Sequence, residues 1–346
     1  MKETSVTPFK TVNLSHRIYH FASRDDKFYA ACSRDGIVTL LSSDFSIERV
    51  FNCSDVIKKK GDGIRIFILH PYVDIFCIGS EDEYRIYTYQ GNLVCSMLER
   101  IEAIYHNPDT NLIWKVRQIN DARKEISLII NDLLQDKIEI EDELYQSAVE
   151  FSLLPESNMI CMTLLAGQDG MMTYLLTNDN GKIEIQHIEK LDENAILDFS
   201  DDKAKFLALD PDSLDKISMY SYPALTVSGE LLLPEEEKES DHQFGFNDYF
   251  IDNTYALIEM GENLFYILNT EKMKIEGKLI VEGHEPKSIS YYWPRLKDDD
   301  GETTNLAQFF KTPAYLIASF KASPNDNEDN SIVVVRRSDI IAALNQ

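Results

Sequence analysis

Acidic side chains are the residues of this 346-residue chain whose type and spacing could do chemistry. Four dense carboxylate runs, EIEDE, EEEKESD, DDDGE and DNED, begin at Glu139, Glu235, Asp298 and Asp326. Hard cations such as Ca²⁺ prefer oxygen ligands of this kind. Neither DDDGE nor DNED has the spacing of an EF-hand loop, so we expect solvated loops that hold no metal and no cofactor.

The common motifs of catalytic and nucleotide-binding sites are missing from the sequence. It contains no GxGxxG, Walker, HExxH or GxSxG motif. Among the seven histidines, His16 and His20 stand four residues apart, but they span an expected turn and strand start, where helical ligand spacing does not apply. We therefore name no catalytic residue and expect a protein that is not an enzyme.

The charge and the cysteines limit the partners and the compartment. A net charge of −25 repels nucleic-acid phosphates and anionic membranes, so we expect neither as a partner. The chain has no apolar run of 18 residues and no apolar leader, which predicts neither a membrane span nor a signal peptide. Cys32, Cys77 and Cys161 end or lie within apolar runs, which favours buried free thiols in a reducing, cytoplasmic setting.

A repeating unit organises the elements that would position these side chains. In KFYAACSRDGIVTLL, from Lys27 to Leu41, Asp35-Gly36 closes a turn between two apolar runs, which predicts a β-hairpin. The same pattern recurs about every 38 to 50 residues, with about four strands per unit. This period is typical of β-propeller blades and predicts an all-β, seven-bladed propeller of four-stranded antiparallel blades.

The chain ends complete this arrangement. The last unit supplies three strands, and residues 9–16 supply a strand that belongs to no other unit, so we expect this N-terminal strand to close the last blade and remove an exposed edge. KSISYYWPR, residues 287–295, is the expected first strand of that blade, and the polar stretch 296–308 is an expected insertion after it. The C-terminal SDIIAALNQ predicts a short helix capped by Ser338.

No linker composition interrupts the repeats, so we expect one domain from residue 1 to residue 346. The expected blades cover residues 17–53, 63–99, 101–141, 148–191, 195–234, 243–282 and 287–337, the last with strand 9–16.

The units resemble degenerate WD40 repeats. FSLLPESNMICMTLL and IYHNPDTNLIWKV are similar to the first turn and second strand of that family, and Gly283-His284 matches its Gly-His dipeptide. The Trp-Asp pair is absent, and the corresponding places read Leu41-Ser42, Tyr89-Gln90 and Leu268-Asn269. The resemblance implies a fold and a structural role for His284. It leaves function open, because one fold hosts many activities.

Acidic runs gather on one predicted face of the propeller, where connections between blades and turns between second and third strands lie together. The residues we expect to bind a partner there are Glu81, Asp82, Glu83, Asp210, Asp212, Glu235, Glu236, Glu237, Glu259 and Glu262. Such a face favours a basic protein or peptide. We expect a non-enzymatic binding protein, either an adaptor or scaffold, or an immunity-type protein that neutralises a basic toxin or nuclease.

An enzyme of the gluconolactonase type is the alternative. Such propellers resemble the expected fold and hold a metal in a central channel, with Asp, Glu and Asn residues from several blades. The oligomeric state stays open at this point.

Overall fold

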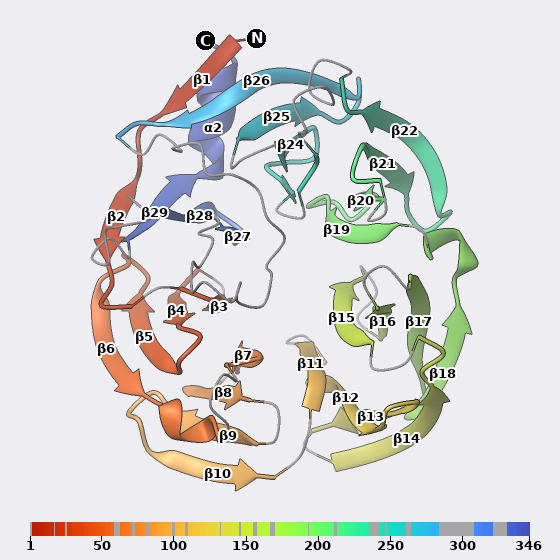
Figure 1. Ribbon diagram of the computed structural model, residues 1–346. Helices are drawn as coiled ribbons and strands as arrows, with labels where there is room; N and C mark the ends of the chain where they lie inside the picture. The colour runs from red at the N-terminus through yellow and green to blue at the C-terminus, as the bar shows by residue number, and fades with distance from the viewer. Residues whose placement is uncertain are drawn as a thin grey trace, which may run out of the picture. The chain divides into compact units, whose positions relative to one another are not determined.

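A computed structural model gives the structure of the chain and describes most of residues 2–346. Not described are residues 17, 25, 59–62, 71–72, 81–82, 99–100, 108–109, 132, 145–146, 155–157, 167–169, 193, 211–212, 235–242, 246–247, 261–263, 284–307 and 321–330. Apart from two 3-10 turns, Ser54–Val56 and Glu189–Leu191, and helix α2, Arg337–Leu344, the regular elements of the described residues are β-strands (Figure 1). An all-β fold is confirmed.

Seven sheets account for these strands. Each has four antiparallel strands, and one of them has a fifth strand that pairs in parallel. The sheets belong to two compact units: an internal unit, Arg17–Glu193, and a terminal unit made of Met1–His16 and Asn194–Gln346. Each of the seven expected repeats corresponds to one sheet. That residues 1–346 form a single domain stays a prediction.

The internal unit contains sheets 1 to 4. Sheet 1 consists of β3 (His20–Arg24), β4 (Phe28–Cys32), β5 (Ile37–Ser42) and β6 (Ile47–Asn52), and sheet 2 of β7 (Ile66–Leu69), β8 (Ile75–Gly79), β9 (Tyr84–Thr88) and β10 (Leu93–Met97). Sheet 3 consists of β11 (Ile101–Asn107), β12 (Leu112–Asn120), β13 (Arg123–Ile130) and β14 (Leu133–Glu141), and sheet 4 of β15 (Ala148–Leu153), β16 (Met159–Leu165), β17 (Met171–Asp179) and β18 (Lys182–His187).

The terminal unit contains sheets 5 to 7. Sheet 5 consists of β19 (Ala195–Phe199), β20 (Lys205–Leu209), β21 (Lys216–Ser221) and β22 (Thr226–Leu232). Sheet 6 consists of β23 (Tyr249–Phe250), β24 (Tyr255–Glu259), β25 (Phe265–Asn269) and β26 (Lys274–Val281), with β1 (Lys2–Val6) as a fifth strand. Sheet 7 consists of β27 (Gln308–Lys311), β28 (Tyr315–Phe320), β29 (Ser331–Arg336) and β2 (Lys10–Asn13).

Burial follows the position of a strand within its sheet. Every residue of β4 is buried, whereas the fourth strands β6 and β10 are mostly exposed. The apolar side chains of neighbouring sheets pack face to face: one cluster joins sheets 1 and 2, another sheets 3 and 4, and others sheets 5 and 6 and sheets 6 and 7. In β4, β20, β25 and β29 nearly every residue is buried, which is why these strands read as continuous apolar runs.

The Asp-Gly hairpin of the sequence is present between β4 and β5. Gly36 has a φ of +83°, a backbone conformation that favours glycine, and a Cβ there would lie 3.0 Å from the backbone nitrogen of Ser54. The turn therefore requires glycine for both its backbone angle and its close neighbour.

The N-terminal strand completes the last sheet, as predicted. Strand β2 pairs antiparallel with β29, with Lys10 opposite Val334 and Asn13 opposite Ser331. The first strand of that sheet differs from the prediction, since β27 begins at Gln308. The expected strand 287–295 lies outside the described residues, and most of the polar stretch 296–308 precedes β27 instead of following the first strand.

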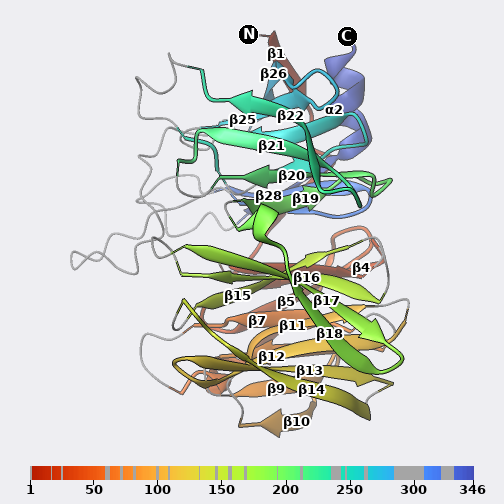
Figure 2. The same ribbon diagram turned by 90° about the vertical axis from the view of Figure 1, so that its right-hand side faces the viewer.

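Two features at the chain ends go beyond the predicted blade. Strand β1 pairs in parallel with β26, from Lys2 opposite Gly277 to Val6 opposite Val281. Helix α2 begins at Arg337, one residue before the predicted cap Ser338, and no side chain caps it. Both ends of the chain lie beside α2 and β1 (Figures 1 and 2), where Lys2 Nζ donates a hydrogen bond of 2.9 Å to Leu344 O.

Candidate functional site

Three of the ten acidic residues predicted to bind a partner lie within the described residues. They are Glu83, Asp210 and Glu259. The other seven lie outside the described residues: Glu81, Asp82, Asp212, Glu235, Glu236, Glu237 and Glu262.

Glu83 is buried, with 2% of its surface exposed, which differs from the acidic surface position that we expected. Its Oε1 accepts hydrogen bonds of 2.6 Å from Arg85 Nε and from Ser96 Oγ, and its Oε2 lies 2.8 Å from Lys58 Nζ. Burial opposes ionisation, but the hydrogen bonds from Lys58, Ser96 and Arg85 outweigh it and lower the pKa of Glu83 to about 2. The carboxylate fastens the turn before β9 to β10.

Asp210 is half-buried and organises the turn between β20 and β21. The backbone N–H of Ser213 donates a hydrogen bond of 3.3 Å to its Oδ1, and the N–H of Leu214 donates one of 3.0 Å to its carbonyl oxygen. This arrangement is typical of an Asp residue that shapes a turn.

Glu259 is fully buried, which also differs from the expected surface position. It ends β24 beside Asp248, which is equally buried. The backbone N–H of Glu259 donates a hydrogen bond of 2.7 Å to Asp248 Oδ1. A Cβ on Gly245 would collide with the Glu259 carboxylate, so the glycine gives that side chain its space.

Burial raises the pKa of Asp248 well above its usual range, and the neighbouring Glu259 carboxyl raises it further against the opposing hydrogen bond from the Glu259 N–H. Asp248 Oδ2 has no hydrogen-bond partner among the described residues. Burial, together with the charges of Asp198, Asp248 and Glu259, also raises the pKa of Tyr249. Three acidic groups thus lie near one tyrosine.

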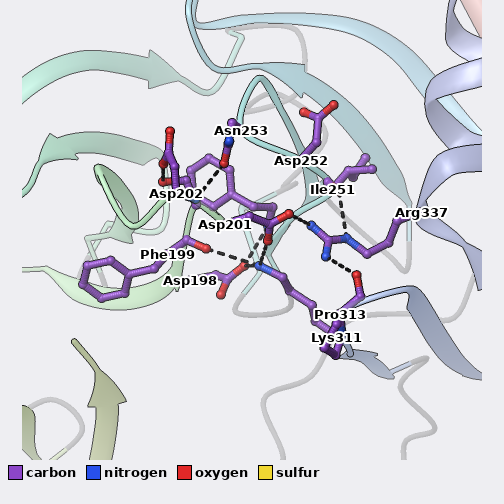
Figure 3. Close-up of polar contacts among 12 residues, drawn as sticks. Asp198, Phe199, Asp201, Asp202, Ile251, Asp252, Asn253, Lys311, Pro313 and Arg337 are labelled. Atoms are coloured by element: carbon purple, nitrogen blue, oxygen red, sulfur yellow. Dashed lines mark hydrogen bonds and ion pairs between the residues drawn. The ribbon is translucent and has the colours of Figure 1, made fainter. Parts of the chain in front are cut away.

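Asp198 joins the first strands of sheets 5, 6 and 7. It lies at a β-bulge in β19, which interrupts the register between Ile196 and Asp198. Its Oδ2 accepts a hydrogen bond of 2.8 Å from the backbone N–H of Phe250 and one of 2.6 Å from Lys311 Nζ (Figure 3). Burial raises the pKa of Asp198, and Lys311 opposes that rise.

A second ion pair continues this network to the C-terminal helix. Arg337, the first residue of α2, donates hydrogen bonds of 2.8 Å to Ile251 O, 2.7 Å to Pro313 O and 2.6 Å to Asp201 Oδ2. Figure 3 shows the guanidinium reaching all three acceptors. Ile251, Pro313 and Asp201 lie in the turns between the first and second strands of sheets 6, 7 and 5. Asp198, Asp201, Lys311 and Arg337 each contact at least two protein groups, which is typical of a structural junction.

Sequence reasoning missed this network because its members are distant in the chain. Lys311 is 113 residues from Asp198, and Arg337 is 136 residues from Asp201. No local pattern links them. The one available signal was positional: Asp198, Asp201 and Lys311 stand near the end of a first strand or in the turn beside it, whereas Arg337 begins α2.

A fully buried ion pair joins strand β13 to the connection that follows sheet 3. Lys124 Nζ lies 3.3 Å from Asp142 Oδ2 and donates a hydrogen bond of 2.7 Å to Ser147 O. Ser147 in turn donates hydrogen bonds from its N–H and its hydroxyl to Asp142. Asp142 lies within the EIEDE run, so part of that acidic stretch stabilises the fold.

The remaining groups that could do chemistry are thiols and possible metal ligands. All five cysteines are free, with Cys32, Cys53 and Cys161 buried and Cys77 partly exposed. Burial raises the pKa of Cys161 to about 12. Within the described residues no three His, Cys, Asp or Glu side chains are grouped as metal ligands. None of the described helices is long and apolar enough to cross a bilayer.

Comparisons with known proteins identify the fold. No family model and no curated protein matches the sequence. The structure of the chain is similar to a solved one. The β-propeller domain of Cps50 (Swd1) from Myceliophteria thermophila aligns with 94% of this chain and 98% of that domain, with a TM-score of 0.59 and 10% identity. The fold is a WD40-like, seven-bladed β-propeller. At this identity the likeness to Cps50 shows the propeller fold alone.

Proposed function

We propose that this propeller is a non-enzymatic protein-binding module whose acidic connections engage a basic protein or peptide. The observation that carries the proposal is the charge: 59 Asp and Glu residues against 34 Lys and Arg residues on a fold suited to protein interaction. Long-range attraction by such a charge speeds the encounter with a cationic partner.

The acidic residues do not all support this function equally. Glu83 and Glu259 are buried and engaged in the fold, so they drop out of the proposed surface. The run EEEKESD, with Glu235, Glu236 and Glu237, follows the fourth strand of sheet 5 and contains five acidic residues against one lysine. We propose it as the centre of the binding surface.

Two roles fit a module of this kind. One is an adaptor or scaffold within a larger assembly, and the other is an immunity-type protein that covers a basic toxin or nuclease. A gene for a basic toxin beside the gene for this protein favours the second role, and its absence favours the first. The free cysteines support a reducing, cytoplasmic setting in both cases.

Charge reversal tests the proposed surface. The probe is a fluorescent 20-residue peptide of alternating Lys and Gly, titrated with the full chain. We expect binding that weakens at least tenfold between about 0.05 and 0.5 M salt, because the screening length falls to a few ångströms. Glu235→Lys with Glu236→Lys weakens binding further at low salt and leaves the melting temperature unchanged.

The matched control reverses two charges elsewhere, Asp298→Lys with Asp299→Lys in DDDGE. We expect a smaller effect on peptide binding. Equal weakening by both pairs, or by neither, contradicts a specific acidic surface and leaves solubility as the role of the charge.

A further inference from the structure

Strand β10 is an uncharged sheet edge, with a bulge between Leu93 and Cys95 in its pairing with β9. It is the outermost strand of sheet 2, and no described strand pairs with its other side. Its sequence is LVCSM, without a charged residue. Leu93 and Val94 are 52% and 57% exposed, Met97 is 41% exposed, and Leu98, the next residue, is 84% exposed.

The other fourth strands are protected in ways that β10 is not. Each carries charged residues: IERVFN in β6, LLQDKIEIE in β14, KIEIQH in β18, TVSGELL in β22, KIEGKLIV in β26 and KTVN in β2. Charges on an edge strand oppose the addition of another strand. Among the seven fourth strands, all of which the structure describes, β10 alone carries no charged residue, and the charged β26 is already paired with β1.

The protein itself shows what a fourth strand can accept. In sheet 6, β1 adds in parallel to β26 over five residue pairs. Thr4 and Val6 of β1 are buried, and so are Leu279 and Val281 of β26. A Cβ on Gly277 would lie 2.7 Å from Thr4 Oγ1, which shows how closely the added strand approaches. A fifth strand is therefore compatible with a blade of this propeller.

We propose that β10 binds an extended segment of a partner protein, which adds to sheet 2 as a fifth strand. Main-chain hydrogen bonds to β10 supply the affinity, and alternate apolar side chains on one face of the segment cover Leu93 and Val94. Met97 pairs with Tyr84 and lies on the other face of the sheet from Leu93, which pairs with Tyr87. The proposal rests on the proposed function, since it gives the protein-binding module a second contact.

Charge favours a different protein over a second copy as the occupant. Two copies that each carry a net charge of −25 repel one another. The segment that fits is apolar at alternate positions and flanked by Lys or Arg, which the negative charge of this chain attracts.

A strand peptide tests the proposal. The probe is a fluorescent peptide, Lys-Val-Thr-Val-Thr-Val-Lys, with blocked ends, measured by anisotropy with the full chain. We expect saturable binding and slower hydrogen exchange of the Leu93–Met97 amides. The same peptide with alternate backbone nitrogens methylated loses the hydrogen-bond donors of one edge, and we expect its affinity to fall at least tenfold.

Matched protein variants locate the site. Val94→Lys places a charge on β10, and Val50→Lys places one on β6, where the wild-type valine is 50% exposed. We expect Val94→Lys to weaken the peptide at least tenfold, Val50→Lys to change binding less than twofold, and both variants to keep the wild-type melting temperature, since surface changes have small effects.

Three outcomes overturn the proposal. They are no binding up to about 1 mM peptide, binding that is indifferent to amide methylation, or equal effects of the two valine variants. A dimer of the free protein that Val94→Lys dissociates makes a second copy the occupant. Failure of the acidic surface gives a different result: Glu235→Lys with Glu236→Lys then leaves the Lys-Gly peptide unaffected while the response to amide methylation of the strand peptide remains.

Discussion

The backbone N–H of Glu259 donates a 2.7 Å hydrogen bond to Asp248 Oδ1, and both side chains are fully buried. Glu259, which the sequence suggested as part of an exposed acidic turn, is therefore buried beside the carboxyl group of Asp248. Burial and the Glu259 carboxyl favour a protonated Asp248, which links the stability of the terminal unit to pH.

Raising the pH should destabilise the protein through Asp248. The folded-state pKa lies above the unfolded value of 3.8, so the folded state binds the proton more tightly. The stabilisation that protonated Asp248 gives the folded state is complete below pH 3.8 and is lost as the pH rises toward the folded-state pKa. The free energy of unfolding falls by at most about 1.4 kcal/mol per pH unit through this group. Asp248→Asn removes this dependence and keeps an acceptor for the Glu259 N–H.

Urea unfolding between pH 5 and pH 8 measures the effect as the difference between wild type and Asp248→Asn. Asp210→Asn, at a half-buried turn residue, is the control. Parallel stability curves for wild type and Asp248→Asn would show that Asp248 ionises normally in the folded protein.

Glu83 should have the opposite pH dependence. Its folded-state pKa of about 2 lies below the usual 4.5, so its contribution is present above pH 4.5 and is lost as the pH falls toward 2. We expect Glu83→Gln to lower the free energy of unfolding by roughly 1–3 kcal/mol at pH 7, because Arg85 and Lys58 lose a charged acceptor.

The control for Glu83 is Glu48→Gln on the exposed strand β6, which should change stability by about 0.5 kcal/mol or less. The loss in Glu83→Gln should shrink as the pH approaches 3. A loss that is constant from pH 3 to pH 7 would assign the effect to packing and not to the charge.

Strands and hairpins were predictable because their signals are local. Asp35-Gly36 between two apolar runs specifies the β4–β5 hairpin, and three strands in the last repeat specify the place of β2. The start of β27 was missed, because its four residues, QFFK, are too few to give a clear strand pattern after a long polar stretch. Burial of Glu83 was missed, because it depends on Lys58 and Ser96, which lie 25 and 13 residues away.

The guanidinium of Arg337 should stabilise the C-terminal helix and the turns beneath it. Arg337→Met keeps much of the apolar stem and leaves the carbonyls of Ile251 and Pro313 and the carboxylate of Asp201 without their donor. We expect a loss of roughly 1–3 kcal/mol. The neighbouring Arg336→Met, whose side chain is 47% exposed, is the matched control and should cost less than about 1 kcal/mol.

A double-mutant cycle of Arg337→Met with Asp201→Asn separates the ion pair from the backbone contacts. We expect a coupling energy of about 0.5–3 kcal/mol, since the two groups are in contact. Additive effects of the two substitutions would place the contribution of Arg337 in its carbonyl contacts alone.

Removing the N-terminal strands should open two sheet edges in the terminal unit. Deletion of residues 1–16 takes away β2, which covers β29, and β1, which covers β26. It also removes the Phe9 ring, which stacks on Tyr315 at 5.5 Å between ring centroids. We expect a lower melting temperature and larger species in size-exclusion chromatography, because unpaired edges invite association.

A shorter deletion divides this effect between the two strands. Deletion of residues 1–7 removes β1 alone and exposes Leu279 and Val281 of β26, so we expect a smaller loss of stability than in the longer deletion. Val12→Asp tests β2 by substitution, since Val12 is buried opposite Ile332, and Asn13→Asp at the exposed neighbouring position is its control. If the chain without residues 1–16 melts at the wild-type temperature and elutes as the wild type does, β2 does not close sheet 7 in solution.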